Sequence, residues 1–378
     1  MTRRPVVVTG IGLVSSLGEG WAAHVEAIRT GGPPRVDNER FAPYPVHPAT
    51  ALNWDGQIPK KSDQRQMEPW QRLGVYAAGL ALDEAGAKDD AALKARMQIV
   101  VGSGGGERDW AVDGQILTGL RSAADRGAFL NERLMNDLRP TLFLAQLSNL
   151  LAGNISIVHG VTGASRTFMG EEACGTDALR IAEARVAAGQ ADIMLVGGSF
   201  NAERPDSLLV FELGGYLWKR PFRPVFDRPA QGGGFILGSA AAFLVVEAAD
   251  HAAQRGAEAL ARLLPVGSAR TRRAPGEVGT SLSRLWEDVA PSPEVLVLSG
   301  ATGVAGATEE ERIALDRLAP GAVRHSLGDA LGHPLEAVAP VAAAIAVGMV
   351  ASGAASDVVA TIVGHRRGEG LVRLAALG

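Results

Sequence analysis

The stretch Gly170-Glu171-Glu172-Ala173-Cys174-Gly175, followed by residues 176–182, is typical of a tight turn that opens a helix with an apolar face. This turn, here called the elbow, holds the only cysteine of the chain. A turn of this kind favours a nucleophile, because free backbone N–H groups and the positive end of the helix dipole stabilise an anion there. The first question is therefore whether the elbow carries a catalyst.

The composition of the whole chain indicates layered α/β architecture. The chain has 378 residues, enough for two large lobes or two domains. Hydrophobic residues make up 47% and aromatic residues only 5%, so the core must be built from Ala, Val, Leu and Ile, with 47 glycines allowing close backbone approach. The nearly all-apolar run 192–198 predicts a strand in a parallel sheet that is covered on both faces.

Charge, cysteine content and hydropathy restrict the possible binding partners and the cellular compartment. The formal net charge is −4, which does not favour nucleic acid. A single cysteine excludes an internal disulfide and fits a reducing compartment. No apolar run reaches the length of a membrane span, and the first apolar run is too short for a signal peptide. We therefore expect a cytoplasmic protein with no membrane span, and no pattern predicts a metal site.

Two glycine-rich turns resemble nucleotide sites only weakly. Gly10-Ile11-Gly12 follows a β-branched strand, but the third glycine is out of register and no acidic residue ends a strand about 20 residues later. The run 102–106 lacks the Gly-Lys-Ser/Thr ending of a phosphate-binding loop. We interpret the second run as a loop where backbones pack closely.

The two halves of the chain resemble each other. Residues 6–10 and 295–300 are similar strand-to-turn units, and each half runs through helices to paired strands. This pattern predicts two related halves, residues 1–250 and 251–378.

Several motifs, in this order along the chain, resemble the beta-ketoacyl-acyl-carrier-protein synthases: 7–12 with Ser15, 149–156, 188–192 with 197–198, 223–228, and 234–238. The resemblance runs from about residue 4 to the end and is strongest in the first 250 residues. It implies the thiolase fold, in which two related halves stack as five layers, αβαβα, and the protein works as a dimer.

The resemblance also locates the family's catalytic triad, a cysteine and two histidines. Counting back from Gly189 places the cysteine position on Glu172, two residues before Cys174. The first histidine position falls on Ala301 and the second on Asp329. A glutamate cannot form the thioester of a condensation, and the chemistry also needs imidazoles to polarise the malonyl thioester and hold the enolate. The sequence therefore predicts no catalytic residues at these positions.

A scaffold that has lost all three residues is similar to the chain-length-factor branch of the family. Those proteins are inactive partners that pair with an active ketosynthase and shape its elongation tunnel in type II polyketide, aryl-polyene or fatty-acid-like biosynthesis. The resemblance implies a heterodimer or a dimer of dimers that is not an enzyme by itself. It implies no cofactor, since acyl chains on phosphopantetheine would arrive on an acyl carrier protein.

By position, Glu107, Trp110 and Gly114 would lie at the dimer interface and face the growing chain. Trp110 could set the tunnel floor, and Gly114 would leave room beside it. Arg366 and Arg367 could contact an acidic carrier protein or its phosphopantetheine, or could form a solvated basic pair.

Two alternatives stay open. The chain could be an acyltransferase or thioesterase that uses Cys174 with Asp329 or His333, or an acyl-binding homodimeric pseudoenzyme. A small buried cysteine is more often structural, and His333 before Pro334 could simply cap or pack the next helix. Glu172 could hydrogen-bond across the elbow and plug a vacated pocket.

Overall fold

The computed structural model describes residues 3–138 and 142–377. Its main sheet has the spatial strand order β12-β11-β13-β14-β9-β1-β8-β6-β4-β5, with β10 beside β14 and β2 beside β1, and β3 pairs separately with β7. The strands are β1 (Val6–Ser15), β2 (Gly18–Glu19), β3 (Val46–His47), β4 (Gln98–Gly102), β5 (Ser165–Phe168), β6 (Ile193–Phe200), β7 (Leu237–Gly238), β8 (Ala240–Ala248), β9 (Ala261–Leu263), β10 (Gly267–Ala269), β11 (Leu296–Ser299), β12 (Arg324–Ser326), β13 (Asp357–Val363) and β14 (Glu369–Ala375).

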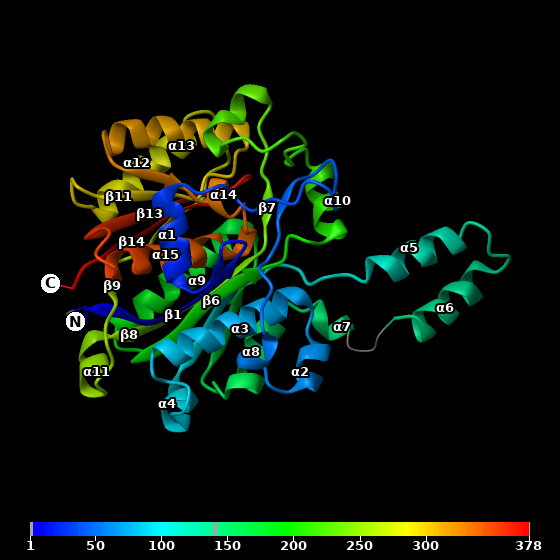
Figure 1. The fold of residues 1–378 in the computed structure, drawn as a ribbon, viewed down its shortest axis with the longest axis horizontal. Coiled ribbons are helices and arrows are strands. Elements are labelled where there is room, and N and C mark those ends of the chain that lie inside the picture. The colour runs from blue at the N-terminus through cyan, green and yellow to red at the C-terminus, as the bar shows by residue number, and fades with distance from the viewer. Residues whose placement is uncertain (1–2, 139–141, 378) are drawn as a thin grey trace.

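Helices cover the outer faces of the sheet, and α9 (Glu171–Ala187) and α15 (Val338–Ala351) lie in the middle of the body (Figure 1). They are α1 (Trp21–Thr30), α2 (Lys61–Gln66), α3 (Pro69–Glu84), α4 (Ala91–Arg96), α5 (Trp110–Gly119), α6 (Arg126–Asn136), α7 (Leu142–Ala145), α8 (Leu150–His159), α9 (Glu171–Ala187), α10 (Pro205–Leu213), α11 (Ala249–Gln254), α12 (Glu277–Val289), α13 (Ala305–Leu318), α14 (Leu327–Ala330) and α15 (Val338–Ala351), with short 3-10 turns η1 (Trp54–Gly56), η2 (Val225–Asp227), η3 (Pro229–Gln231) and η4 (Leu335–Ala337).

Strand pairing repeats between the two halves of the chain. In the first half, β4 is parallel to β5 and β6, β6 is antiparallel to β8, and β8 is antiparallel to β1. In the second half, β11 is parallel to β12 and β13, β13 is antiparallel to β14, and β14 is antiparallel to β9. The two halves are therefore built on one plan. The predicted boundary after residue 250 falls within α11 and stays a prediction.

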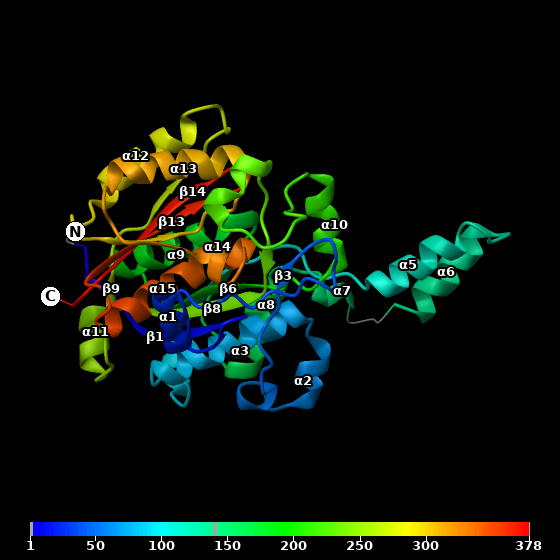
Figure 2. The same cartoon turned by 45° about the horizontal axis from the view of Figure 1, so that its top comes forward.

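The elements stack in five layers (Figure 2). Helices α12 and α13 cover β11, β13 and β14; α9 and α15 lie in the middle; β1, β8, β6 and β4 follow; α3 and α8 cover the far face. Because α15 contacts strands of both halves, it must be apolar on most sides, and every residue from Val338 to Val350 is buried.

The long apolar helix begins later than its sequence predicts. We expect helix from residue 331, but α15 starts at Val338. Pro334 disfavours helical backbone at the residue before it, and a 3-10 turn over Leu335–Ala337 precedes the helix. This delay places residues 332–337 in a loop beside the elbow instead of inside a helix.

The glycine-rich turns serve packing. A Cβ on Gly10 or Gly12 would lie 2.3 or 1.7 Å from carbonyl oxygens of α3, so these glycines let α3 lie directly on β1. A Cβ on Gly102 would lie 2.8 Å from the backbone nitrogen of Gly175 in α9. Within the run 102–106, Gly106 also approaches a backbone closely, since a Cβ on it would lie 2.2 Å from the Ala145 carbonyl oxygen, whereas Gly105 has nothing within 4 Å.

One segment projects from the layered body. We expect helix throughout residues 110–133, but the segment is a hairpin of α5 and α6 that extends away from the sheet (Figures 1 and 2). Within the described residues, no helix combines the length and apolar character needed to cross a membrane.

Candidate functional site

The elbow has a constrained backbone at the N-terminus of α9. Gly170 has φ 124° and Glu171 has φ 50°, in the left-handed region that a residue with a side chain adopts only at a cost of about 1–3 kcal/mol. This turn directs Glu172, the residue at the family's cysteine position, into the interior, where it is completely buried.

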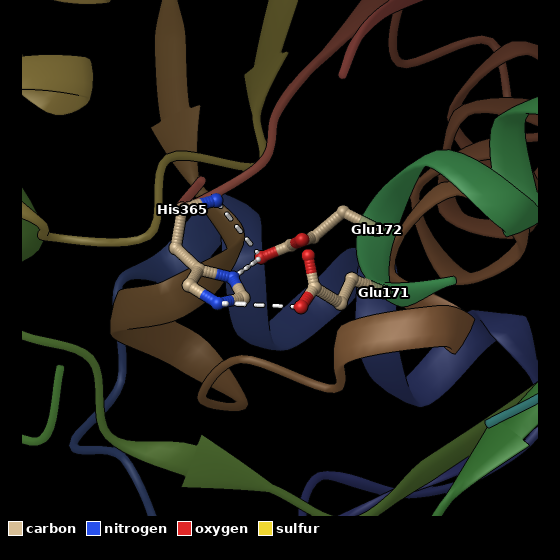
Figure 3. Close-up of side chains that lie close together, drawn as sticks. All are labelled: Glu171, Glu172 and His365. Atoms are coloured by element: carbon tan, nitrogen blue, oxygen red, sulfur yellow. Dashed lines mark hydrogen bonds and ion pairs between the residues drawn. The ribbon is translucent and has the colours of Figure 1, made fainter. Parts of the chain in front are cut away.

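The Glu172 carboxylate is held by two imidazoles. Its Oε1 accepts hydrogen bonds from His333 Nε2 at 2.8 Å, from His365 Nδ1 at 2.9 Å, and from the His365 backbone N–H at 3.1 Å. Figure 3 shows Glu172 and His365 approaching from opposite sides, one from the start of α9 and the other from the loop after β13. All three side chains are buried.

Burial alone would oppose ionisation of Glu172. The hydrogen bonds and positive charge of His333 and His365 outweigh that effect, so the pKa of Glu172 lies below its usual value. The group is therefore a carboxylate at neutral pH. It cannot act as a general acid, and it has none of the reactivity toward thioesters that a thiolate has.

The second oxygen of Glu172 lies in a tight space. Oε2 has no hydrogen-bond partner among the described residues, and a Cβ on Gly364 would lie 3.0 Å from it. The same Cβ would lie 2.3 Å from the carbonyl oxygen of Arg367. Gly364 thus lets the turn after β13 close over the carboxylate.

Aromatic side chains surround the two imidazoles. The His365 ring lies edge-on to Tyr216, Phe235 and Phe211, with ring centroids 4.6, 5.5 and 5.7 Å away. Phe235 also contacts His333, at 5.3 Å. These contacts fix the ring orientations and keep water away from the carboxylate.

Glu171 faces the outer side of the same cluster. Its Oε1 accepts a hydrogen bond from Arg366. The same oxygen lies 3.8 Å from His365 Nε2 (Figure 3). Of the predicted basic pair, Arg366 has an ion-pair partner within the chain, Glu171. The Arg366 side chain is 52% exposed. Glu171, Glu172 and His365 are close enough to hold a metal ion. The absence of a metal site stays a prediction.

Two predicted triad positions lie elsewhere in the structure. Ala301 is buried and its N–H donates to Ser299 Oγ at 3.1 Å. Asp329 accepts a hydrogen bond from the Val225 N–H at 2.6 Å, so it faces η2 instead of Glu172. The imidazole beside Glu172 belongs to His333. The placement of the family's second histidine position on Asp329 stays a prediction.

The position of His333 has a local reason. Residues 327–330 form the short helix α14, and His333 lies in the loop that follows it, where Pro334 and η4 delay the start of α15. The dipeptide Gly332-His333, directly before the apolar helix, is the sequence signal that identifies it. His365 lies in the turn after β13, and no sequence motif singled it out.

Cys174 is a buried thiol. It is 2% exposed, and its Sγ donates to the Glu171 carbonyl oxygen at 3.0 Å. Burial, with the negative charges of Glu336 and Glu172, raises its pKa well above the usual value. A thiol held in this way is a poor nucleophile.

Of the three predicted tunnel residues, Trp110 and Gly114 lie one turn apart on α5, whereas Glu107 precedes the helix. Glu107 is buried, and its Oε1 accepts hydrogen bonds from Asn201 Nδ2 at 3.0 Å and from the Trp70 N–H at 3.1 Å. Trp110 is 59% exposed at the start of the projecting α5, and Gly114 has open space around it. Their role at a tunnel or interface stays a prediction. Glu107 is part of the buried interior of this subunit.

A cavity of about 220 Å³ lies beside the elbow. Its walls include Gly104–Gly106 and side chains of α10. Phe211 lines this cavity and also contacts the His365 ring edge-on. Glu336 closes one wall, and no sequence pattern singles it out.

Comparisons with known proteins agree on one family. The family model described as Beta-ketoacyl synthase, N-terminal domain, matches residues 3–252. The 3-oxoacyl-[acyl-carrier-protein] synthase 2 of Vibrio cholerae is 29% identical over 276 residues, and that of Rhizobium meliloti is 28% identical over 283 residues. The matches cover 71% and 70% of this chain, but only 63% and 64% of those relatives.

Solved structures show the same fold at low identity. The ishigamide ketosynthase/chain length factor superposes with a TM-score of 0.80 at 20% identity, covering 100% of both chains. A beta-ketoacyl synthase from Burkholderia phymatum gives 0.79 at 20% identity, also with 100% of both chains covered. A structure described as a type II polyketide acyl-carrier protein in complex with its ketosynthase gives a TM-score of 0.74 at 18% identity. The match covers 99% of this chain and 100% of the other chain. The thiolase-like fold expected from the sequence is thereby confirmed.

Proposed function

The chain belongs to the beta-ketoacyl synthase family, and from this premise we propose that it is a non-catalytic, chain-length-factor-like subunit. It pairs with an active ketosynthase in polyketide, aryl-polyene or fatty-acid-like biosynthesis and shapes the cavity in which the chain grows.

The occupied elbow carries this proposal. Decarboxylative condensation needs a thiolate that accepts the acyl group and two imidazoles that are free to contact the malonyl thioester. Here a buried carboxylate occupies the nucleophile position, Ala301 offers no imidazole, and both His333 and His365 donate to Glu172. Both imidazoles are engaged by one oxygen of Glu172, which supports a structural role for the site.

The surface around α10 supports a partner subunit. Leu209, Val210 and Leu213 are 60%, 63% and 80% exposed, and exposed apolar side chains continue onto α7 and the projecting hairpin on the same side of the body (Figure 1). The edge strand β5 also has a neighbour on one side only within the described sheet. Apolar surface of this extent and an open strand edge are features of subunit interfaces.

The carrier protein is the second proposed partner. The polyketide ketosynthase among the structural neighbours is described in complex with its acyl-carrier protein. We extend this to the present chain through its partner ketosynthase, with acyl chains arriving on phosphopantetheine and no cofactor held by the chain itself.

Co-expression tests the proposal. We expect the chain to co-purify with the ketosynthase encoded in its gene neighbourhood, and Leu213→Asp to abolish co-purification. Ile313→Asp is the matched control, because Ile313 is 55% exposed but lies on α13, away from α10. A stable homodimer that ignores the ketosynthase would refute the proposal and favour the homodimeric pseudoenzyme.

The alternative enzyme has a separate test. An acyltransferase or thioesterase using Cys174 needs an accessible thiolate, whereas this thiol is buried and its pKa is raised by that burial. Mass spectrometry after incubation with acyl carrier protein would detect an acyl adduct on Cys174. We expect none.

A further inference from the structure

The turn after β13 covers the elbow. Residues 364–368, here called the closing turn, carry His365, whose backbone N–H and Nδ1 both donate to Glu172. The turn is joined at its base, where the Gly364 N–H donates to the Gly368 carbonyl oxygen at 2.9 Å. A Cβ on Gly368 would lie 2.7 Å from a Cβ atom in the first turn of α9, so the base lies directly on that helix. The closing turn therefore shields Glu172 from solvent.

A side chain from another loop, Arg273, holds the base of the closing turn. Its Nη2 donates to the carbonyl oxygens of Gly364 and Gly368, at 2.5 and 3.3 Å. Its Nη1 donates to Thr271 Oγ1 at 2.5 Å and forms an ion pair with Glu369, the first residue of β14. The guanidinium thus joins both ends of the turn to the strand that follows it.

The surroundings of Glu369 fix this ion pair in place. The Glu369 side chain is fully buried and the Arg273 side chain is 16% exposed. Two hydroxyl groups also donate to Glu369, Thr271 Oγ1 at 2.9 Å and Ser281 Oγ at 3.2 Å. A carboxylate buried in this way depends on its cation, because removal of one partner leaves an uncompensated charge. The pair is therefore a firm connection between two segments that are distant in sequence.

The backbone of Arg273 is strained. Its φ is 64°, in the left-handed region that favours glycine and that a residue with a side chain adopts only at an energetic cost. Such strain persists only where the surrounding contacts determine the conformation, and it is typical of clamps and switch regions. Here those contacts are the bonds of Arg273 to the closing turn and to Glu369.

We propose that Arg273 and Glu369 form a latch that holds the closing turn shut over the elbow, and that the turn opens as a local unit when the latch is broken. In the closed state His365 keeps its hydrogen bonds to Glu172 and is inaccessible to solvent. When the turn opens, His365 leaves Glu172 and becomes exposed. The latch goes beyond the proposed function, because it acts within one chain and needs no partner.

The buried histidines provide the test. Diethyl pyrocarbonate modifies accessible imidazoles, and peptide mass spectrometry measures each histidine of the full-length chain separately. In wild type we expect His365 to react as slowly as His24 and His47, since all three are buried. Arg273→Met should raise the modification rate of His365 roughly tenfold to hundredfold, as the loss of hydrogen bonds to a charged group provides. His24 and His47 should stay slow, because the opening is local.

Two further variants make the result specific. Arg273→Gly removes the latch and also relieves the strain at φ 64°, so this variant should stay folded while His365 reacts quickly. Arg373→Met is the matched control. Arg373 is 19% exposed, forms an ion pair with Asp357, and donates to carbonyl oxygens at the end of α12, further along β14 from the closing turn. Its removal should leave the rate at His365 unchanged.

Three outcomes would each overturn the proposal. The first is an unchanged rate at His365 in both Arg273 variants. The second is equal acceleration at His24, His47 and His365 in Arg273→Gly, which would show global unfolding instead of a local opening. The third is acceleration at His365 in Arg373→Met as large as in Arg273→Met, which would show that any buried ion pair has the same effect.

Discussion

Replacing Glu172 with alanine tests the central claim that the carboxylate holds the elbow together. The substitution removes the acceptor of three hydrogen bonds from His333 and His365 and leaves both imidazoles buried without it. The aromatic rings around His365 prevent water from replacing the carboxylate easily.

The expected loss of stability is large for a single side chain. Removing one partner of a buried charged pair costs about 3–5 kcal/mol. With an unfolding entropy of about 2.1 cal/mol/K per residue, a chain of 378 residues loses roughly 1.3 °C of melting temperature for each kcal/mol. We therefore expect Glu172→Ala to melt about 4–6 °C below wild type.

The pH sets the window of this effect. Because the pKa of Glu172 is lowered in the folded state, its stabilisation is present above the ordinary value of 4.5 and is lost as the pH falls through the folded value. The melting difference should therefore be full at pH 7 and shrink in acid below 4.5. Differential scanning calorimetry at several pH values measures it.

Glu171→Ala is the matched control for this measurement. Glu171 is the neighbouring residue and pairs with the half-exposed Arg366, so its removal should cost no more than about 1 kcal/mol. Equal melting temperatures for Glu172→Ala and Glu171→Ala would refute the reasoning. In the complex with a ketosynthase, Glu172→Ala should keep most of the condensation activity. A complex that stays assembled but loses all condensation would show that Glu172 has a role beyond structure.

Three further outcomes follow from the buried groups. Glu336→Gln should stabilise the fold by up to about 3 kcal/mol at pH 8 and by little at pH 4.5. The pKa of Glu336 is raised to about 7 in the folded state, so the wild-type protein loses stability as the pH rises through that value. Urea unfolding at both pH values measures the difference, and a pH-independent difference would contradict the prediction. Cys174 should react with iodoacetamide much more slowly in the native protein than in urea, and fast native alkylation followed by mass spectrometry would show an accessible thiolate. Glu172→Cys should give no condensation of malonyl and acyl carrier proteins, since Ala301 still lacks an imidazole, and carbon dioxide release detects any that occurs. Activity in that single variant would show that His333 and His365 suffice without an imidazole at position 301.

Local patterns in the sequence were enough to predict much of this protein. The tight turn before an apolar-faced helix predicted the elbow, and the echo between residues 6–10 and 295–300 anticipated strand pairing that repeats in two halves. Counting from Gly189 placed Glu172 at the elbow, because the helix between them has a fixed rise per residue and carries the spacing without error. Periodicity and spacing within one element are properties that the sequence expresses directly.

Tertiary structure alone decided which side chains meet Glu172. His333 and His365 lie 161 and 193 residues further along the chain, in loops whose backbone path no local pattern specifies. The delay of α15 after Pro334 put His333 against the elbow instead of Asp329, and the packing of the Gly104 loop gave Glu336 its place in the cavity. The elbow is therefore readable as a turn from its own residues. Its chemistry depends on loops that converge only when the two halves pack around α9 and α15, because a side chain in a loop points where the surrounding layers allow.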